Sequence, residues 1–184
     1  MDTLRLIAGA ATLLIVGGCA DGRDTVALTD PALSAEDDRS TVSANAASQV
    51  AVSGHYDALV DFSTLTLTPK GNNCLLEVAG QLVFTGTIQG TATGRTSALV
   101  LAPCAEVASN PPGTFGDTFK SDLVFEGTVD GEPATADLRY VGQVKPGGSI
   151  DARLIFTGGV TGSLDTQNAV VAVGGDYSGN VIIN

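Results

Sequence analysis

One nine-residue pattern occurs three times in this sequence: LVFTGTIQG at residues 82–90, LVFEGTVDG at 123–131 and LIFTGGVTG at 154–162. Successive side chains of a β-strand point to opposite faces of the sheet. The Leu, the Phe, the first Gly and the later Ile or Val of each copy therefore share one face. The pattern is typical of a strand in an antiparallel sheet, with one apolar and one polar face, that runs into a turn at its last Gly.

Further runs of alternating apolar and polar residues bring the expected number of strands to about eight. They occupy residues 50–62 and 64–68, which form either two strands or one long bent strand, and then residues 75–88, 91–101, 119–129, 134–140, 150–156, 169–173 and 176–183. Gly, Pro, Asn and Asp mark the expected turns, which fall at residues 69–73, 130–131, 145–148 and 174–175. Residues 102–118 are expected to form the longest connection.

An open sheet of eight antiparallel strands would leave two unpaired edges, and closure into an up-and-down barrel removes both. The first Gly of each copy also favours a barrel, because a strongly coiled strand needs a position without Cβ. A β-sandwich is the alternative. We expect Phe84, Phe125, Phe156 and Tyr140 to face the barrel interior. The three tyrosines, which include Tyr56 and Tyr177, are also candidates to line its mouth.

The beginning of the chain predicts export. Residues 6–16 are an apolar run that follows Arg5 and is too short for a transmembrane helix, which needs about 20 residues. The run ends in Val16-Gly17-Gly18-Cys19, which resembles the lipobox of bacterial lipoproteins. The resemblance implies a signal peptide of residues 1–18, acylation of Cys19, and a lipid-anchored, extracytoplasmic location at the cell membrane or the outer membrane. An ordinary secretory signal with an accidental cysteine is the alternative.

Residues 19–47 are rich in Asp, Ser, Ala and Thr and show no sustained period. This composition predicts a flexible tether, although residues 33–39 would also suit a short helix. The tether leads to a β-domain of residues 48–184. That domain is not predicted to be disordered, since 43% of the whole chain is hydrophobic and its mean hydropathy is +0.25.

Charge and cysteine content narrow the function further. The formal net charge is −11, with 9 basic against 20 acidic residues and no basic cluster, so a nucleic acid is not an expected partner. If Cys19 is acylated, Cys74 and Cys104 remain, and an even remainder in an oxidising compartment predicts a disulfide. Such a bond would tie the long connection to the turn before the first copy. Two buried free thiols are the alternative.

A second resemblance concerns the barrel. Residues 122–131, together with Gly174-Gly175-Asp176-Tyr177-Ser178-Gly179, are similar to the allene-oxide-cyclase-like barrel group, which includes small bacterial proteins. The resemblance implies an eight-stranded barrel with a cavity. It carries no catalytic residue to this chain, because no position matches the site of the plant enzymes.

Candidate chemistry is sparse. His55 is the only histidine, and the sequence lacks the G-x-S-x-G motif of serine hydrolases. Residues 165–168 and 174–176 offer oxygen ligands, but neither stretch follows a calcium-binding pattern. No catalytic residue, metal site or cofactor is therefore predicted. We expect a non-catalytic barrel that binds a small apolar ligand or an envelope protein. The alternatives are a structural or adhesive protein with a filled barrel and, as a third option, an isomerase- or cyclase-like enzyme.

Overall fold

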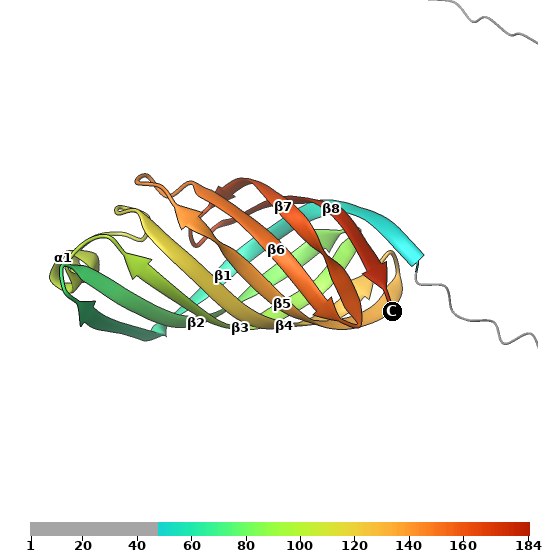
Figure 1. Cartoon of the computed structure of the whole chain (residues 1–184), viewed down its shortest axis with the longest axis horizontal. Coiled ribbons are helices and arrows are strands. Elements are labelled where there is room, and N and C mark those ends of the chain that lie inside the picture. Colours follow the sequence, from blue (N-terminus) through green and yellow to red (C-terminus); the bar gives the residue numbers. More distant parts are fainter. Residues whose placement is uncertain (1–47) are drawn as a thin grey trace, which may run out of the picture. The chain divides into compact units, whose positions relative to one another are not determined.

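A computed structural model describes residues 48–184 of the chain. The described part forms eight antiparallel strands that close into a barrel, in which each strand pairs with its sequence neighbours and β8 pairs with β1 (Figure 1). The elements are β1 (Ser48–Lys70), β2 (Asn73–Gly86), β3 (Ile88–Val100), α1 (Cys104–Ser109), β4 (Asp117–Val129), β5 (Glu132–Val144), β6 (Ile150–Gly158), β7 (Val160–Val170) and β8 (Gly174–Ile183). The predicted barrel is confirmed. The predicted signal peptide, Cys19 and the tether lie outside the described residues.

The barrel forms because its strands alternate as the sequence predicts. Along β4, Ser121, Leu123 and Phe125 are buried, whereas Asp122, Val124 and Glu126, which alternate with them, are exposed. The apolar positions of all three copies of the pattern are buried, and they are Leu82, Phe84 and Ile88, then Leu123, Phe125 and Val129, then Leu154, Phe156 and Val160. These nine side chains form much of one hydrophobic core inside the barrel.

The turns of the first and third copies lie elsewhere than predicted. Strand β2 ends at Gly86 and β6 ends at Gly158, the first Gly of each copy, where φ is +108° and +100°. The chain reverses there, and its last Gly already belongs to the next strand, so that Phe84 pairs with Gly90 and Phe156 with Gly162. A positive φ is readily reached by glycine, which makes the earlier Gly the turning point.

The second copy behaves as predicted. Strand β4 continues to Val129, and the chain then turns at Asp130 and Gly131, whose φ angles of +52° and +85° are both positive. Positive φ at both central residues is the signature of the type I′ turn that joins twisted antiparallel strands, and Asp-Gly is among its favoured sequences. The same pattern therefore supports two different hairpin geometries.

The structure decides between the two alternatives for residues 50–68 and corrects the strand expected at residues 169–173. Residues 48–70 form the single long strand β1, with an irregularity in its pairing to β2 between Asp61 and Thr66. Strand β7 occupies Val160–Val170 rather than 169–173, and Gly174 and Gly175 begin β8 instead of forming a turn. A Cβ at Gly174 would lie only 2.0 Å from the carbonyl oxygen of Tyr56. These two glycines are thus explained by close approach between strands.

The predicted disulfide between Cys74 and Cys104 is present, with its Cα atoms 4.8 Å apart. Cys74 lies near the start of β2 and Cys104 begins α1, a short helix that the sequence did not predict in the long connection. Apolar side chains pack around the bond, and together they form a second, smaller cluster that includes Leu67, Leu76, Val100, Ala102, Val107 and Phe115. The bond and this cluster hold α1 against the hairpin formed by β1 and β2.

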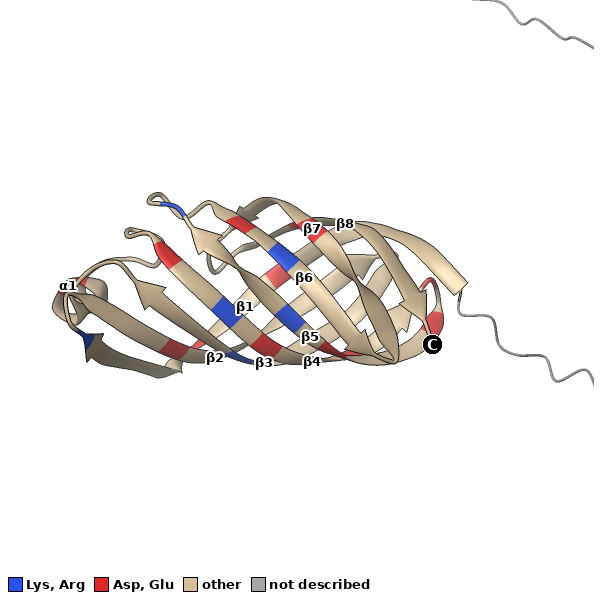
Figure 2. Ribbon diagram, in the orientation of Figure 1, with Lys and Arg blue, Asp and Glu red and all other residues tan. Residues whose placement is uncertain are grey.

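Positions of acidic and basic residues are spread along the strands (Figure 2). Asp122 of β4 forms ion pairs with Lys120 (2.7 Å) and Arg139 (3.3 Å). Arg153 of β6 forms an ion pair with Asp165 of β7 at 3.1 Å. These pairs are exposed, so each contributes little to stability. No helix within residues 48–184 has the length and apolar character that a membrane span needs.

Candidate functional site: a cavity in the open half of the barrel

Aromatic side chains fill one half of the barrel interior. The rings of Phe84, Phe125 and Phe156 meet as predicted, with centroids 5.6 to 6.3 Å apart. Tyr56 and Tyr177 pack against Phe84 at 6.0 and 5.7 Å. We call the region around these five rings the filled half. At most 2% of each of these residues is exposed, so the filled half is a packed core.

Glycines make room for these rings. A Cβ at Gly127 would lie 2.9 Å from the tip of the Phe125 ring, so this ring lies over the glycine two residues further along its own strand. The Tyr177 hydroxyl likewise lies close to the backbone of Gly54 and Gly86. It accepts a hydrogen bond from the Ile88 N–H at 3.0 Å. Gly127, inside β4, therefore leaves room for a ring of its own strand, and Gly86, at the end of β2, leaves room for the Tyr177 hydroxyl.

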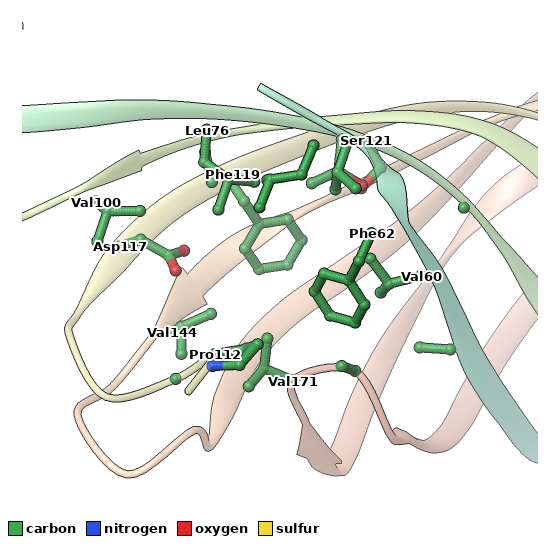
Figure 3. Close-up of a pocket in the computed structure, with 18 of the residues that line it drawn as sticks. Val60, Phe62, Leu76, Val100, Pro112, Asp117, Phe119, Ser121, Val144 and Val171 are labelled. Atoms are coloured by element: carbon green, nitrogen blue, oxygen red, sulfur yellow. The ribbon is translucent and has the colours of Figure 1, made fainter. Parts of the chain in front are cut away.

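The other half of the barrel, which we call the open half, holds a cavity of about 300 Å³ (Figure 3). Most of its wall is apolar and is supplied by β1 to β5 together with residues 107–115, including Val60, Leu76, Val78, Val100, Phe119 and Val144. Ligand pockets begin at roughly this volume and are mostly lined by hydrophobic side chains. The barrel is therefore filled at one end and hollow at the other.

A pair of tyrosines separates the two halves. Tyr140 lines the cavity, and its hydroxyl lies 2.7 Å from that of Tyr56 in the filled half. Burial is the largest cause that raises the pKa of both phenols, so both stay neutral at physiological pH. A hydrogen bond between two buried neutral hydroxyls satisfies both groups at little cost. The tyrosines thus form a floor that is polar only at one point.

The outer end of the cavity is covered by residues 104–116. Val107 of α1 and Phe115 line the cavity, and the covering loop is fixed at two points. The disulfide holds its beginning, and the Gly147 N–H donates a hydrogen bond to the Gly113 carbonyl oxygen at 2.9 Å near its end. The cavity still reaches the surface beside β1, where lining residues Leu59 and Phe62 are 51% and 53% exposed.

Polar groups in the cavity wall are few. Ser121 of β4 and Thr96 of β3 both line the cavity, and their hydroxyl oxygens are 2.7 Å apart, so they satisfy each other. The remaining polar group of note is Asp117, the first residue of β4 and, among residues 48–184, the only charged residue that lines the cavity. Figure 3 shows its carboxyl group directed into the space between Val100, Val144 and Phe119.

The Asp117 carboxyl group is poorly satisfied. Its Oδ1 atom is buried and has no hydrogen-bond partner among the described residues. Burial raises the pKa of Asp117 from its ordinary value of 3.8 to about 6, and the backbone of Val144 on the paired strand opposes the rise only in part. A buried polar atom without a partner is costly, and in a cavity it marks a candidate binding or catalytic group.

The raised pKa predicts a pH-dependent penalty on stability. The folded protein binds the proton of the Asp117 carboxyl group more tightly than the unfolded chain does. The free energy of unfolding therefore falls as pH rises from about 4 to above 6 and this proton is lost. The loss amounts to roughly 1 to 2 kcal/mol once partial hydration is allowed for. Asp117→Asn should therefore gain stability relative to the wild type between pH 4 and pH 7.5, as measured by denaturant unfolding at both values. An unchanged difference would contradict the raised pKa.

The structure assigns the predicted interior residues to different places. Phe84, Phe125 and Phe156 belong to the filled half, and Tyr140 lines the cavity. Tyr56 and Tyr177 were candidates for the mouth, but they are buried in the filled half, because Ala58 and Val60 continue the inward face of β1 beyond Tyr56. Cys19, the predicted site of lipid attachment, lies outside the described residues.

His55 lies on the outer surface, away from the cavity lining. Its Nδ1 atom is 2.9 Å from an oxygen of Asp176, and its Nε2 atom is 3.7 Å from Asp57. Asp176 also accepts a hydrogen bond from Asn168 at 3.0 Å, and these contacts hold the pKa of Asp176 below its ordinary value. Within residues 48–184, His, Cys, Asp and Glu form no group of three that would hold a metal ion. These residues form an exposed polar cluster.

Sequence reasoning missed Asp117 and Ser121. It began the fourth strand at residue 119 and assigned Asp117 to the long connection, whereas β4 begins two residues earlier. The sequence did contain a signal for them. Asp117 and Ser121 lie an even number of residues away from Phe119, Leu123 and Phe125, so in one continuous strand all five share a face. Extending that alternation backwards would have placed a carboxyl group and a hydroxyl group on the inward face.

Comparison of the chain with models of protein families, with curated protein sequences and with solved structures finds no significant match.

Proposed function

We propose that this protein binds a small apolar ligand in the open half of its barrel and is held at a bacterial membrane by a lipid on Cys19. The observation that carries the first part is the cavity of about 300 Å³ with its apolar wall. A barrel that served only as a scaffold would gain stability from filling this space, since each unfilled methyl-sized gap costs on the order of 1 kcal/mol.

The contrast between the two halves supports a binding role. In the filled half, five aromatic rings pack in contact, so this sequence is able to fill a barrel of this size. In the open half, small side chains such as Ala58 and Ala98 stand at the wall. The half-exposed Leu59 and Phe62 give the cavity an apolar rim, which suits the entry of an apolar molecule.

Filling the cavity should abolish binding. Ala98 is buried on β3 and lines the cavity, so Ala98→Leu places extra carbon atoms in the space that a ligand would occupy. We expect this variant to bind the uncharged dye Nile red at least about tenfold more weakly than the wild type. Titration of dye fluorescence in detergent-free buffer measures the affinity, with every protein made as the full chain in a Cys19→Ser background so that no acyl chain binds the dye.

The matched control is Ser97→Leu, which adds a similar side chain at the neighbouring exposed position of the same strand. Its dye affinity should equal that of the wild type. Native mass spectrometry of protein extracted from the cell envelope provides an independent readout, because a ligand bound in the cell adds mass that Ala98→Leu should lose. Equal dye binding by the wild type and Ala98→Leu would contradict the proposed site.

The membrane anchor is supported by the short apolar run of residues 6–16 that ends in Gly17-Gly18-Cys19. The disulfide between Cys74 and Cys104 is compatible with an oxidising compartment outside the cytoplasm. Two or three acyl chains on one cysteine give durable anchoring that a single chain does not. Together these features support a barrel that is held near a membrane surface, into which apolar small molecules partition.

Metabolic labelling tests the anchor. Cells supplied with a tagged fatty acid should label the wild-type protein and leave Cys19→Ser unlabelled, because the modified thiol is then absent. The Cys19→Ser protein should also move from the membrane fraction to the soluble fraction. Equal labelling of the two proteins would disprove acylation at Cys19.

A further inference from the structure

We propose that Asp117 receives the protonated amine of an amphiphilic ligand whose alkyl chain occupies the cavity. The inference rests on the proposed function and adds to it the chemical class of the ligand, a primary aliphatic amine. It is carried by an unpartnered carboxyl oxygen in the wall of an apolar cavity. Hydrogen bonds between ionised partners are the strongest that such an oxygen can form.

The position of Asp117 suits a head group at the outer end of the cavity, beside the segment that covers it. Asp117 begins β4, directly after the covering loop, and is paired with Val144 at the end of β5. The cavity extends from there along β4, past Phe119 and Ser121, to Leu123. Strands rise about 3.3 Å per residue, so Asp117 and Leu123 are separated by about 20 Å of strand. An alkyl chain whose amine reaches Asp117 can therefore extend inward toward the floor.

The charge of the cavity wall selects for a cation. In the described part of the chain, Asp117 is the only charged residue that lines the cavity, and no Lys, Arg or His lines it. Among the described residues, Asp117 forms no ion pair, whereas Asp122 on the same strand pairs with Lys120 and Arg139 on the outer surface. A fatty acid would bring a second negative charge beside Asp117 with no cation to offset it. The net charge of −11 for the whole chain acts in the same direction.

An uncharged head group satisfies the site less well. An alcohol would donate one hydrogen bond to Oδ1, but it would leave the carboxylate charge in an apolar wall without an opposite charge. A water molecule at this oxygen would have the same shortcoming. An ammonium group supplies both the hydrogen bond and the charge. It also favours the ionised form of a carboxyl group whose pKa burial has raised to about 6.

Three ligands that share one alkyl chain test the assignment. Octylamine, octanol and octanoate are titrated by isothermal calorimetry at pH 8 in detergent-free buffer into the full chain, with wild-type and variant barrels all made in a Cys19→Ser background that carries no acyl chain. At this pH Asp117 is ionised and the amine is protonated. The wild type should bind octylamine at least about tenfold more tightly than octanol, and octanoate more weakly than either.

Three variants complete the design. In Asp117→Asn the preference for octylamine over octanol should fall to within about threefold, while octanol binding persists. Glu126→Gln removes one negative charge from the exposed face of the same strand and should keep the wild-type preference. Asp117→Glu restores a carboxylate and should retain most of the preference, which guards against a folding defect of the Asn variant. Thermal unfolding confirms that each variant is folded.

The outcomes separate this inference from the function on which it rests. If the wild type binds neither octanol nor octylamine, the proposed function fails. If it binds both with equal affinity, or if Asp117→Asn keeps the amine preference, the head-group assignment is overturned and the apolar cavity remains a binding site. If Glu126→Gln loses the preference as Asp117→Asn does, the selectivity arises from overall charge, and the assignment to Asp117 is wrong.

Discussion

Phe125→Ala is expected to lower the free energy of unfolding by roughly 3 to 5 kcal/mol. Phe125 is fully buried, and its ring contacts those of Phe84 and Phe156 in edge-to-face geometry at 5.8 and 5.6 Å. It also lies over Gly127, where no Cβ would fill the space that the ring leaves. The neighbouring rings are held by strands of a closed sheet, so they cannot collapse into the gap. Denaturant unfolding monitored by tyrosine fluorescence measures the loss.

Two comparisons give this result its meaning. Glu126→Ala changes the exposed neighbour of Phe125 and should alter stability by less than about 0.5 kcal/mol. Phe119→Ala removes a ring that borders the cavity and contacts Tyr140 at 4.9 Å, so less packing is lost and the cost should be clearly smaller than for Phe125→Ala. Equal losses at Phe119 and Phe125 would show that the open half is packed as tightly as the filled half.

Removal of the disulfide should have the next largest effect. Cys74 and Cys104 are 30 residues apart, and in the chain-entropy account a bond across such a loop stabilises the folded state by on the order of 3 to 4 kcal/mol. The double variant Cys74→Ala/Cys104→Ala is expected to lose about this much stability. It should also bind Nile red more weakly than the wild type, because the bond fixes the segment that covers the cavity.

The experiment needs the wild type in both redox states. Alkylation of the exported, unfolded protein before and after reduction should differ by two modified thiols per mature chain. The reduced wild type and the double variant should then show similar stability. A double variant as stable as the oxidised wild type would contradict the predicted contribution of the bond, and two freely alkylated thiols without reduction would contradict the bond itself.

Much of the fold follows from local sequence signals. The alternation of apolar and polar residues in the three copies correctly placed Phe84, Phe125 and Phe156 inside, because the period of a strand is two residues whatever the strand pairs with. The number of strands and their closure into a barrel followed from short connections and from the need to pair every edge. The disulfide was predicted because two cysteines, Cys74 and Cys104, remain once Cys19 is assigned to the lipid.

The errors occurred where one residue type serves two purposes. Glycine marks turns, but it also permits close approach between strands. Gly174 and Gly175 were therefore taken for a turn although they begin β8, while Gly86 and Gly158 were taken for mid-strand positions although the chain reverses there. Which purpose applies depends on the backbone that lies opposite, and that backbone is distant in sequence.

The sequence by itself determined which side chains face inward, since that depends only on the alternation along each strand. Only the tertiary structure decided that Phe84, Phe125 and Phe156 fill one half of the barrel whereas Ala98 and Asp117 border a cavity in the other. Whether inward side chains fill a barrel depends on the sum of their volumes at each level of the closed sheet. Strands distant in sequence contribute to every level, so no single stretch of the chain contains that sum.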